Sequence, residues 1–308
     1  MLVTLKDILK LCEAKKCATG SFNTPNLEAI MAVIGAAEEL KVPVVIQMAE
    51  SHEEIMPLDI IGPIMLDLAE KASVPVAVHL DHGETVDYIY RALKMGFTSV
   101  MYDGSNLPFD ENAANTRMVV DLARKTGASV EAEIGSMGKR ETGLGSSGSG
   151  PDPEKIYTDP LQAKEFVEQT GIDALACSFG TTHGVYLTKP KLDFSVVENV
   201  RKEANIPVVM HGGSGVSDED FRHAIRSGVR KVNYYTYMAL AGGQRIENQF
   251  QMGCIPVEKD GKKYKYCFSL VESDKDAPIM YHDIVRWGTA AMRDNCKKAM
   301  KVFSMRED

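Results

Sequence analysis

Short apolar runs alternate with longer amphipathic segments along most of this chain. The apolar runs span residues 17–22, 42–48, 74–80, 98–103, 128–134, 173–179, 206–212 and 229–234. The segments between them, such as NLEAIMAVIGAAEELK, have the spacing of amphipathic helices, and several end at a glycine. Almost continuously apolar strands are typical of a parallel sheet that is buried on both faces. The pattern therefore predicts an α/β protein with a (β/α)8 barrel, the TIM-barrel fold.

An open doubly wound sheet is the alternative, although no GxGxxG turn follows the first strand. Two segments depart from the alternation. Residues 135–160 form a long loop rich in glycine and serine, and residues 253–278 read as an insertion. The Asp260–Gly261 pair in that insertion predicts a β-hairpin. Residues 280–304 predict a C-terminal helical extension, and we expect residues 1–308 to form a single domain.

Polar and titratable side chains stand where most of the expected strands end. They are Asn23, Asp81, His82, Asp103, Glu131, Glu133, His183, His211 and Asn233. In a barrel, the carboxyl ends of the strands meet at one rim, and the loops that follow them build the active site. We therefore expect these side chains to converge on one site.

Composition narrows the class of protein. Hydrophobic residues make up 44% and charged residues 25% of the 308 residues, which is ordinary for a globular protein. A net charge of −8 argues against a nucleic-acid partner. We expect no membrane segment, because no apolar run approaches about 18 residues. The six cysteines are scattered without a CxxC pair, which favours free thiols and a cytoplasmic location.

Three histidines at strand ends, His82, His183 and His211, are candidate ligands of a metal ion. Three imidazoles would leave an open position on zinc, as a catalytic site requires. Their spacing carries no local signature, so the same histidines could instead cap strands or bond to the rim. The other histidines are expected to be packed, capping or surface residues: His52, His79, His223 and His282.

Six motifs raise the odds of a metal enzyme: HLDHG (79–83), GFTSVMYDGSNLPFDEN (96–112), SVEAEIG (129–135), TGIDALACSFGTTHGVY (170–186), IPVVMHGGSGV (206–216) and GVRKVNYYT (228–236). In this order they resemble the class II, zinc-dependent fructose-bisphosphate aldolases, a family that includes tagatose-bisphosphate and other ketose-phosphate aldolases. The resemblance covers roughly residues 1 to 245. The family is known to fold as (β/α)8 barrels, in agreement with the strand pattern.

The resemblance implies a role for each matching residue. It implies His82, His183 and His211 as zinc ligands, with Glu133 and Asp103 near an alternate or second cation. Asp81 matches the catalytic acid, Glu141 the loop glutamate that exchanges the donor-carbon proton, and Asn233 the residue that contacts the enediolate. The resemblance implies that the substrate and its phosphate contact Asn23, Gly184, Gly212, Ser214 and Thr236. It also implies a monovalent cation (Na⁺ or K⁺) beside the phosphate.

The implied reaction is reversible cleavage of a phosphorylated ketose to dihydroxyacetone phosphate and an aldehyde. Positions that would hold the ends of the substrate depart from the family: Ala49, Leu187, Tyr235 and Thr289, with Lys189, Arg286 and Arg293 nearby as possible replacements. Each lost charge-assisted contact to phosphate costs about 1.5–3 kcal/mol. We therefore expect a substrate other than fructose 1,6-bisphosphate.

Several alternatives stay open. The protein could be an ordinary fructose- or tagatose-bisphosphate aldolase, or a sugar-phosphate-binding barrel without turnover. A Schiff-base aldolase is disfavoured because the sixth strand, which ends in ACSFG, carries no lysine. The resemblance also implies a homodimer or homotetramer.

Overall fold

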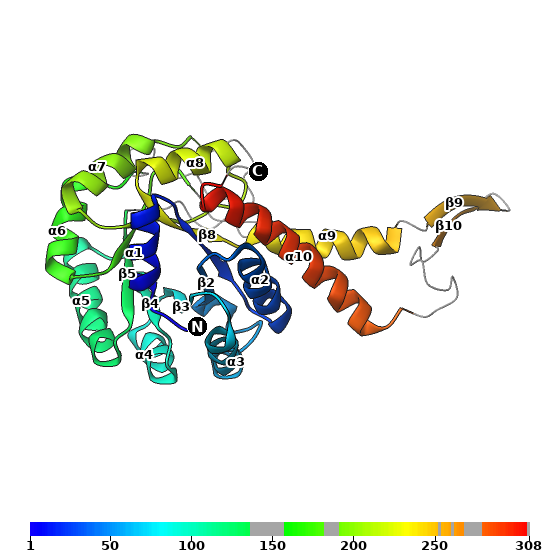
Figure 1. The fold of residues 1–308 in the computed structure, drawn as a ribbon, viewed down its shortest axis with the longest axis horizontal. Helices are drawn as coiled ribbons and strands as arrows, with labels where there is room; N and C mark the ends of the chain where they lie inside the picture. The colour runs from blue at the N-terminus through cyan, green and yellow to red at the C-terminus, as the bar shows by residue number, and fades with distance from the viewer. Residues whose placement is uncertain (136–156, 182–190, 252–253, 260–261, 268–278, 307–308) are drawn as a thin grey trace.

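A computed structural model describes residues 1–135, 157–181, 191–251, 254–259, 262–267 and 279–306 (Figure 1). Eight parallel strands close into a barrel in sequence order, because β1 pairs with both β2 and β8. The strands are β1 (Thr19–Asn23), β2 (Val44–Ala49), β3 (Val76–Gly83), β4 (Ser99–Tyr102), β5 (Ser129–Ile134), β6 (Ala174–Cys177), β7 (Val208–Met210) and β8 (Val229–Tyr234). The predicted (β/α)8 barrel is confirmed, and the doubly wound alternative is wrong.

Helices surround the barrel in the order that the amphipathic segments predict (Figure 1). One helix precedes the first strand, and the others connect consecutive strands. They are α1 (Leu5–Lys15), α2 (Leu27–Leu40), α3 (Leu58–Lys71), α4 (Val86–Met95), α5 (Phe109–Thr126), α6 (Pro160–Thr170), α7 (Phe194–Ala204) and α8 (Asp218–Ser227).

Local sequence signals set the ends of these helices. α1 begins with a capping box, in which the Thr4 side chain accepts from the Asp7 amide and Asp7 bonds back to Thr4. α4 begins after Thr85, whose hydroxyl accepts from the Tyr88 amide, and ends at Gly96 with a φ of 109°. Glycine reaches this left-handed conformation without steric cost, so each such helix stops where the next strand must begin.

The interior of the barrel is apolar at one end and polar at the other. Leu5, Ile8 and Leu9 of α1 pack against Val45 and Ala77, which lie near the amino ends of their strands. A second, larger core fills the space between the strands and the outer helices. The carboxyl ends of the strands are left to carry the polar side chains.

The C-terminal part of the chain extends away from the barrel (Figure 1). α9 (Thr236–Gln251) and α10 (Tyr281–Phe303) pack against each other, and α10 also packs against α2. The strands β9 (Cys254–Lys259) and β10 (Lys262–Cys267) pair antiparallel, which confirms the predicted hairpin. The helical extension is likewise confirmed. Among the described residues, no helix is both long and apolar enough to cross a lipid bilayer.

Candidate active site

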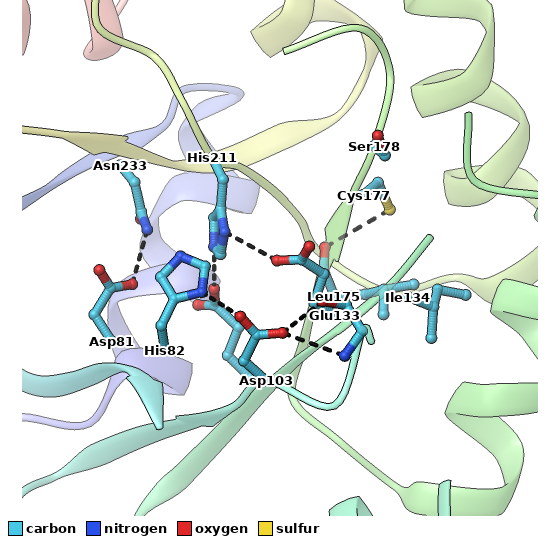
Figure 2. A network of polar contacts seen from close by, with 12 residues as sticks. Asp81, His82, Asp103, Glu133, Ile134, Leu175, Cys177, Ser178, His211 and Asn233 are labelled. Carbon is cyan, nitrogen blue, oxygen red and sulfur yellow. Dashed lines mark hydrogen bonds and ion pairs between the residues drawn. The ribbon is translucent and has the colours of Figure 1, made fainter. Parts of the chain in front are cut away.

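The strand ends bring most of the predicted site residues together at one rim of the barrel. Figure 2 shows Asp81, His82, Asp103, Glu133, His211 and Asn233 pointing toward one another from five different strands or the turns that follow them. Asn23 joins them from the end of β1. All but Asp103 are buried, and Asp103 is half-buried.

The carboxylate of Asp81 is held from two sides. The amide nitrogen of Asn23 donates to Asp81 Oδ2 at 2.9 Å, and that of Asn233 donates to Oδ1 at 3.0 Å. Gln47 in turn donates to Asn23 Oδ1 at 2.9 Å, which fixes the direction of that amide. Burial alone would raise the pKa of Asp81, but positive charge at His82 and Lys231 outweighs it and holds the pKa well below the usual range. Asp81 is therefore an ionised carboxylate.

Local backbone geometry lets adjacent residues both reach the site. Successive side chains of a regular strand point to opposite faces. The β3–β4 register shifts between Leu80 and Gly83, and His82 has a φ of 45°, in the left-handed region. Such a conformation is costly for a residue other than glycine, and, unlike the left-handed Lys16 and Lys41, His82 does not end a helix. It places the His82 imidazole beside the Asp81 carboxylate.

The two described histidines of the predicted ligand set face each other. The ring centroids of His82 and His211 lie 4.7 Å apart, close to perpendicular. His82 Nδ1 contacts Asp103 Oδ2 at 2.6 Å, and Asp103 also accepts from the Ser105 hydroxyl at 2.7 Å. Carboxylates that hold one ring nitrogen fix the orientation of the other, as around metal-bound histidines.

His211 is held by two glutamates. Its Nε2 lies 2.9 Å from Glu131 Oε1, and its Nδ1 lies 3.2 Å from Glu133 Oε2. Burial alone would lower the pKa of His211, but these two carboxylates raise it to about 10. An imidazole between two buried carboxylates favours a positive charge at this position, whether a proton or a metal ion supplies it.

The donor atoms fit a metal ion. Ligand atoms of Asp81, His82 and His211 all lie within 4.8 Å of one another, and so do those of His82, Asp103 and Glu133. The two groups share His82, so two overlapping positions can be served by nitrogen and oxygen ligands. This mixture of imidazole and carboxylate suits zinc and similar transition metals.

A buried layer of charged and polar side chains lies beneath the rim. Of its members, the pattern of strand ends predicts only Glu131. Lys231 Nζ lies 2.9 Å from Glu131 Oε2 and donates to Asn233 Oδ1 at 2.8 Å. His79 Nδ1 lies 2.8 Å from the Ser99 hydroxyl. All four of Lys231, Glu131, His79 and Ser99 are fully buried.

A signal for this layer is present in the sequence. Residues two positions apart on a strand face the same side of the sheet. His79 precedes Asp81 by two positions, and Lys231 precedes Asn233 by two. Polar residues that repeat at this spacing within otherwise apolar strands indicate a polar interior, one layer below the site.

A cavity of about 350 Å³ opens beside Asp81 and His82. The predicted substrate residues Asn23, Gly212, Ser214 and Thr236 line it. Tyr235, which was expected near an end of the substrate, also lines it, and so do Ser51 and His52, for which no substrate contact was expected. His52, expected to be a capping or surface residue, is half-buried and contributes to the wall. The chain after β2 forms only one helical turn, and this places the partly exposed His52 at the rim.

The structure leaves several predicted positions undescribed. Glu141, His183, Gly184, Leu187 and Lys189 fall outside the described residues, as does most of the 135–160 loop.

The C-terminal positions considered for the distal phosphate lie on α10. The Thr289 hydroxyl donates to the Val285 carbonyl of its own helix at 2.8 Å. Arg293 pairs with Glu39 of α2 at 2.5 Å, so its guanidinium serves the α2–α10 contact.

Comparison with known proteins places the chain in a group of enzymes. The family model described as fructose-bisphosphate aldolase class-II matches residues 3–308. The chain is 38% identical over 266 residues to a probable fructose-bisphosphate aldolase of Bacillus subtilis (strain 168), covering 85% of this chain and 90% of the relative. It is 39% identical over 249 residues to the uncharacterized protein YdjI of Escherichia coli (strain K12), covering 81% and 88%. The crystal structure of the YdjI aldolase from Escherichia coli K12 aligns with a TM-score of 0.80 and 33% identity, covering 98% of this chain and 97% of that one.

Proposed function

This chain belongs to the class II fructose-bisphosphate aldolase family and is an aldehyde-lyase, and on that premise we propose its reaction. The enzyme reversibly cleaves a phosphorylated ketose to dihydroxyacetone phosphate and an aldehyde. The observation that best supports this reaction is the ionised carboxylate of Asp81, held by Asn23 and Asn233 beside the facing rings of His82 and His211. A fixed base next to a candidate metal position is what retro-aldol cleavage requires.

We propose that the metal is Zn²⁺, with His82, His183 and His211 as its ligands and with Glu133 and Asp103 near an alternate or second cation. This assignment is supported by two candidate metal-binding groups, of which one contains His82 and His211 and the other contains His82, Asp103 and Glu133. When bound, zinc supplies a Lewis acid for the negative charge that develops on the ketone oxygen. Asp103, Glu131 and Glu133 hold the two described imidazoles in place.

Asp81 performs the proton transfer at the hydroxyl group next to the bond that breaks. In cleavage its carboxylate accepts the C4 hydroxyl proton, and in condensation it returns that proton. Both carboxylate oxygens already accept an amide hydrogen bond, so the direction of the remaining lone pairs is fixed. Asn233 contacts the enediolate, and Glu141 exchanges the proton on the donor carbon.

The donor phosphate binds to the turn after β7, at Gly212 and Ser214, with Thr236 opposite and Gly184 and a monovalent cation completing the site. This turn is closely packed, because a Cβ at Gly213 would come within 2.8 Å of the Asn233 carbonyl oxygen. Glycine at position 213 is therefore required by packing against β8, and we propose that main-chain N–H groups of this turn donate to the phosphate.

We propose a substrate other than fructose 1,6-bisphosphate, since Thr289 stands where the family has an arginine for the second phosphate and Ala49 and Tyr235 replace other substrate contacts. The alternative is an ordinary fructose-bisphosphate aldolase, which the names of the relatives favour. Release of dihydroxyacetone phosphate from a panel of ketose 1-phosphates and bisphosphates distinguishes the two. Efficient cleavage of fructose 1,6-bisphosphate would overturn the substrate proposal, and zinc binding without any release would favour a binding protein. Assembly as a homodimer or homotetramer is also part of the proposal.

A further inference from the structure

We propose that His52 and Tyr235 select the aldehyde half of the substrate, and that they favour an uncharged hydroxyaldehyde over a phosphorylated one. This inference rests on the proposed aldolase function. It assigns a specificity role to two residues that the catalytic steps do not use.

The position of the two rings supports this role. His52 ends the short helix η1 (Glu50–His52) that follows β2, and Tyr235 follows β8. Their ring centroids lie 5.2 Å apart with a tilt of 50°, and both residues line the cavity beside Asp81. The donor phosphate is proposed to bind near Ser214, after β7. A substrate that passes Asp81 then extends toward the end of β2, where the two rings meet it.

Two glutamates brace the segment that carries His52. Glu50 accepts from the amides of Glu84 at 2.7 Å and Thr85 at 3.2 Å, and from the Thr85 hydroxyl at 3.0 Å. These bonds tie the end of β2 to the start of α4. Since an exposed turn of three residues would otherwise be mobile, they reduce the ordering cost when a ligand binds.

The second brace lies on the other side of His52. Glu53 accepts from the Leu58 amide at 2.8 Å and from the Tyr88 hydroxyl at 2.5 Å. The main chain at His52 is thereby held between two braced residues, and its ring packs against Tyr235. A fixed imidazole on a cavity wall is suited to recognition, because its hydrogen-bonding direction is set before the substrate arrives.

The charge of this wall disfavours a phosphate. Among the described lining residues, the wall at Ser51, His52 and Tyr235 carries no lysine or arginine, and it lies apart from the glycine-containing turn at Gly212 and Ser214 that is proposed to hold the donor phosphate. Ala49 offers no hydroxyl there, and Arg293 is paired with Glu39. The Glu50 carboxylate beside His52 adds negative potential, whereas the Glu53 carboxylate is compensated by the Arg91 guanidinium at 3.6 Å. A second phosphate would meet repulsion, whereas an imidazole nitrogen and a phenol hydroxyl can exchange hydrogen bonds with neutral hydroxyl groups.

The experiment separates the two halves of the reaction. Exchange of the donor-carbon hydrogen of dihydroxyacetone phosphate with deuterated water needs no aldehyde, and NMR measures it. Condensation is then measured with glyceraldehyde, erythrose, glyceraldehyde 3-phosphate and a carboxylated aldehyde. We expect kcat/KM for the neutral aldehydes to exceed that for the charged ones at least tenfold. In His52→Ala and Tyr235→Phe, we expect the ratio of condensation to exchange to fall by about tenfold, the loss of one to two hydrogen bonds.

A matched control and a conservative variant complete the design. Tyr90→Phe removes a hydroxyl from an exposed position on α4 and should leave the ratio unchanged. His52→Gln, which keeps hydrogen-bonding groups, should recover part of the loss. A preference for a charged aldehyde, or an unchanged ratio in both variants, overturns the inference. Absence of exchange in the unaltered protein instead overturns the proposed aldolase function, so the two failures are distinguishable.

Discussion

Replacing Lys231 by methionine tests whether the buried layer beneath the site maintains its geometry. The Lys231 ammonium lies between the Glu131 carboxylate and the Asn233 amide oxygen, at 2.9 and 2.8 Å, and is fully buried. Burial alone would raise the pKa of Glu131, but Lys231 is the main cause that lowers it, to about 2. The pair is therefore charged at neutral pH, and Lys231→Met leaves a buried carboxylate without its cation.

The expected loss of stability is large. Removal of one partner from a buried ion pair costs about 3–5 kcal/mol, because the other charge stays buried. His211 and His79 still lie near Glu131, at 2.9 and 3.7 Å, which favours the lower end of this range. An exposed lysine gives the control: Lys202→Met, at a side chain that is 78% exposed, should change stability by less than about 0.5 kcal/mol.

A double-mutant cycle isolates the pair itself. Glu131→Gln in the Lys231→Met background removes the carboxylate charge that has lost its cation. The double variant should therefore be more stable than the sum of the two single losses of stability predicts. Urea denaturation, followed by circular dichroism, provides the four free energies of unfolding: those of the unaltered protein, the two single variants and the double variant. Strictly additive effects, or a single-variant loss below about 1 kcal/mol, would refute the reasoning.

Activity should also fall, because Lys231 fixes the orientation of the Asn233 amide. Without a donor at Oδ1, the amide can rotate and turn its oxygen toward the Asp81 carboxylate, which disrupts the 3.0 Å hydrogen bond. The exchange of the donor-carbon hydrogen should therefore slow even at temperatures where the variant remains folded. Exchange at the unaltered rate in folded Lys231→Met would show that Asn233 does not depend on this contact.

Three further predictions concern the metal, the base and the loop that carries His52. Chelator treatment should abolish cleavage and added Zn²⁺ should restore it; full activity in protein shown to be metal-free by elemental analysis would exclude a metal role. Asn23→Ala leaves one oxygen of Asp81 without its hydrogen-bond donor and should lower kcat by about tenfold or more. An unchanged pH-rate profile in this variant would contradict a role of the Asn23 hydrogen bond in holding Asp81. Burial opposes the ionisation of Glu53, but hydrogen bonds from Tyr88 and the Leu58 amide outweigh it, so its pKa is lowered. At pH values above the usual glutamate pKa, Tyr88→Phe should therefore lower the free energy of unfolding by less than about 1 kcal/mol, because Glu53 is partly exposed. This difference should vanish as the pH falls through the lowered pKa of Glu53. A loss of stability that persists in acid would show that Tyr88 stabilises the protein by packing.

The barrel could be predicted because its determinants are local. Runs such as VPVVIQM are too apolar for a half-exposed strand, and glycines such as Gly96 stop helices where the next strand begins. The rim residues could be predicted for a related reason. Parallel strands bring their carboxyl ends together, so Asp81, His211 and Asn233 had to share one rim once the barrel was recognised.

The buried pair and the pocket wall could not be predicted in the same way. Lys231 and Glu131 lie far apart in the sequence, and their pairing depends on the tertiary arrangement of β5 and β8. The left-handed conformation of His82 has no local signal, since neither glycine nor asparagine marks it. The place of His52 at the rim could not be predicted either, because the Glu50 carboxylate beside it bonds to amides in the next loop along the chain.

The buried layer explains how the metal-binding side and the substrate-binding side of the site keep their relative positions. Glu131 contacts His211, a proposed metal ligand, while Lys231 contacts Asn233, a proposed substrate ligand. Lys231 and Glu131 also bind each other. The proposed metal ligand after β7 and the proposed substrate ligand on β8 are therefore held by the same ion pair. A shift of either strand would separate charges that have no water to compensate them, which is costly in a buried environment. The barrel thus uses the high cost of a buried, unpaired charge to fix the distance between the imidazole of His211 and the amide of Asn233.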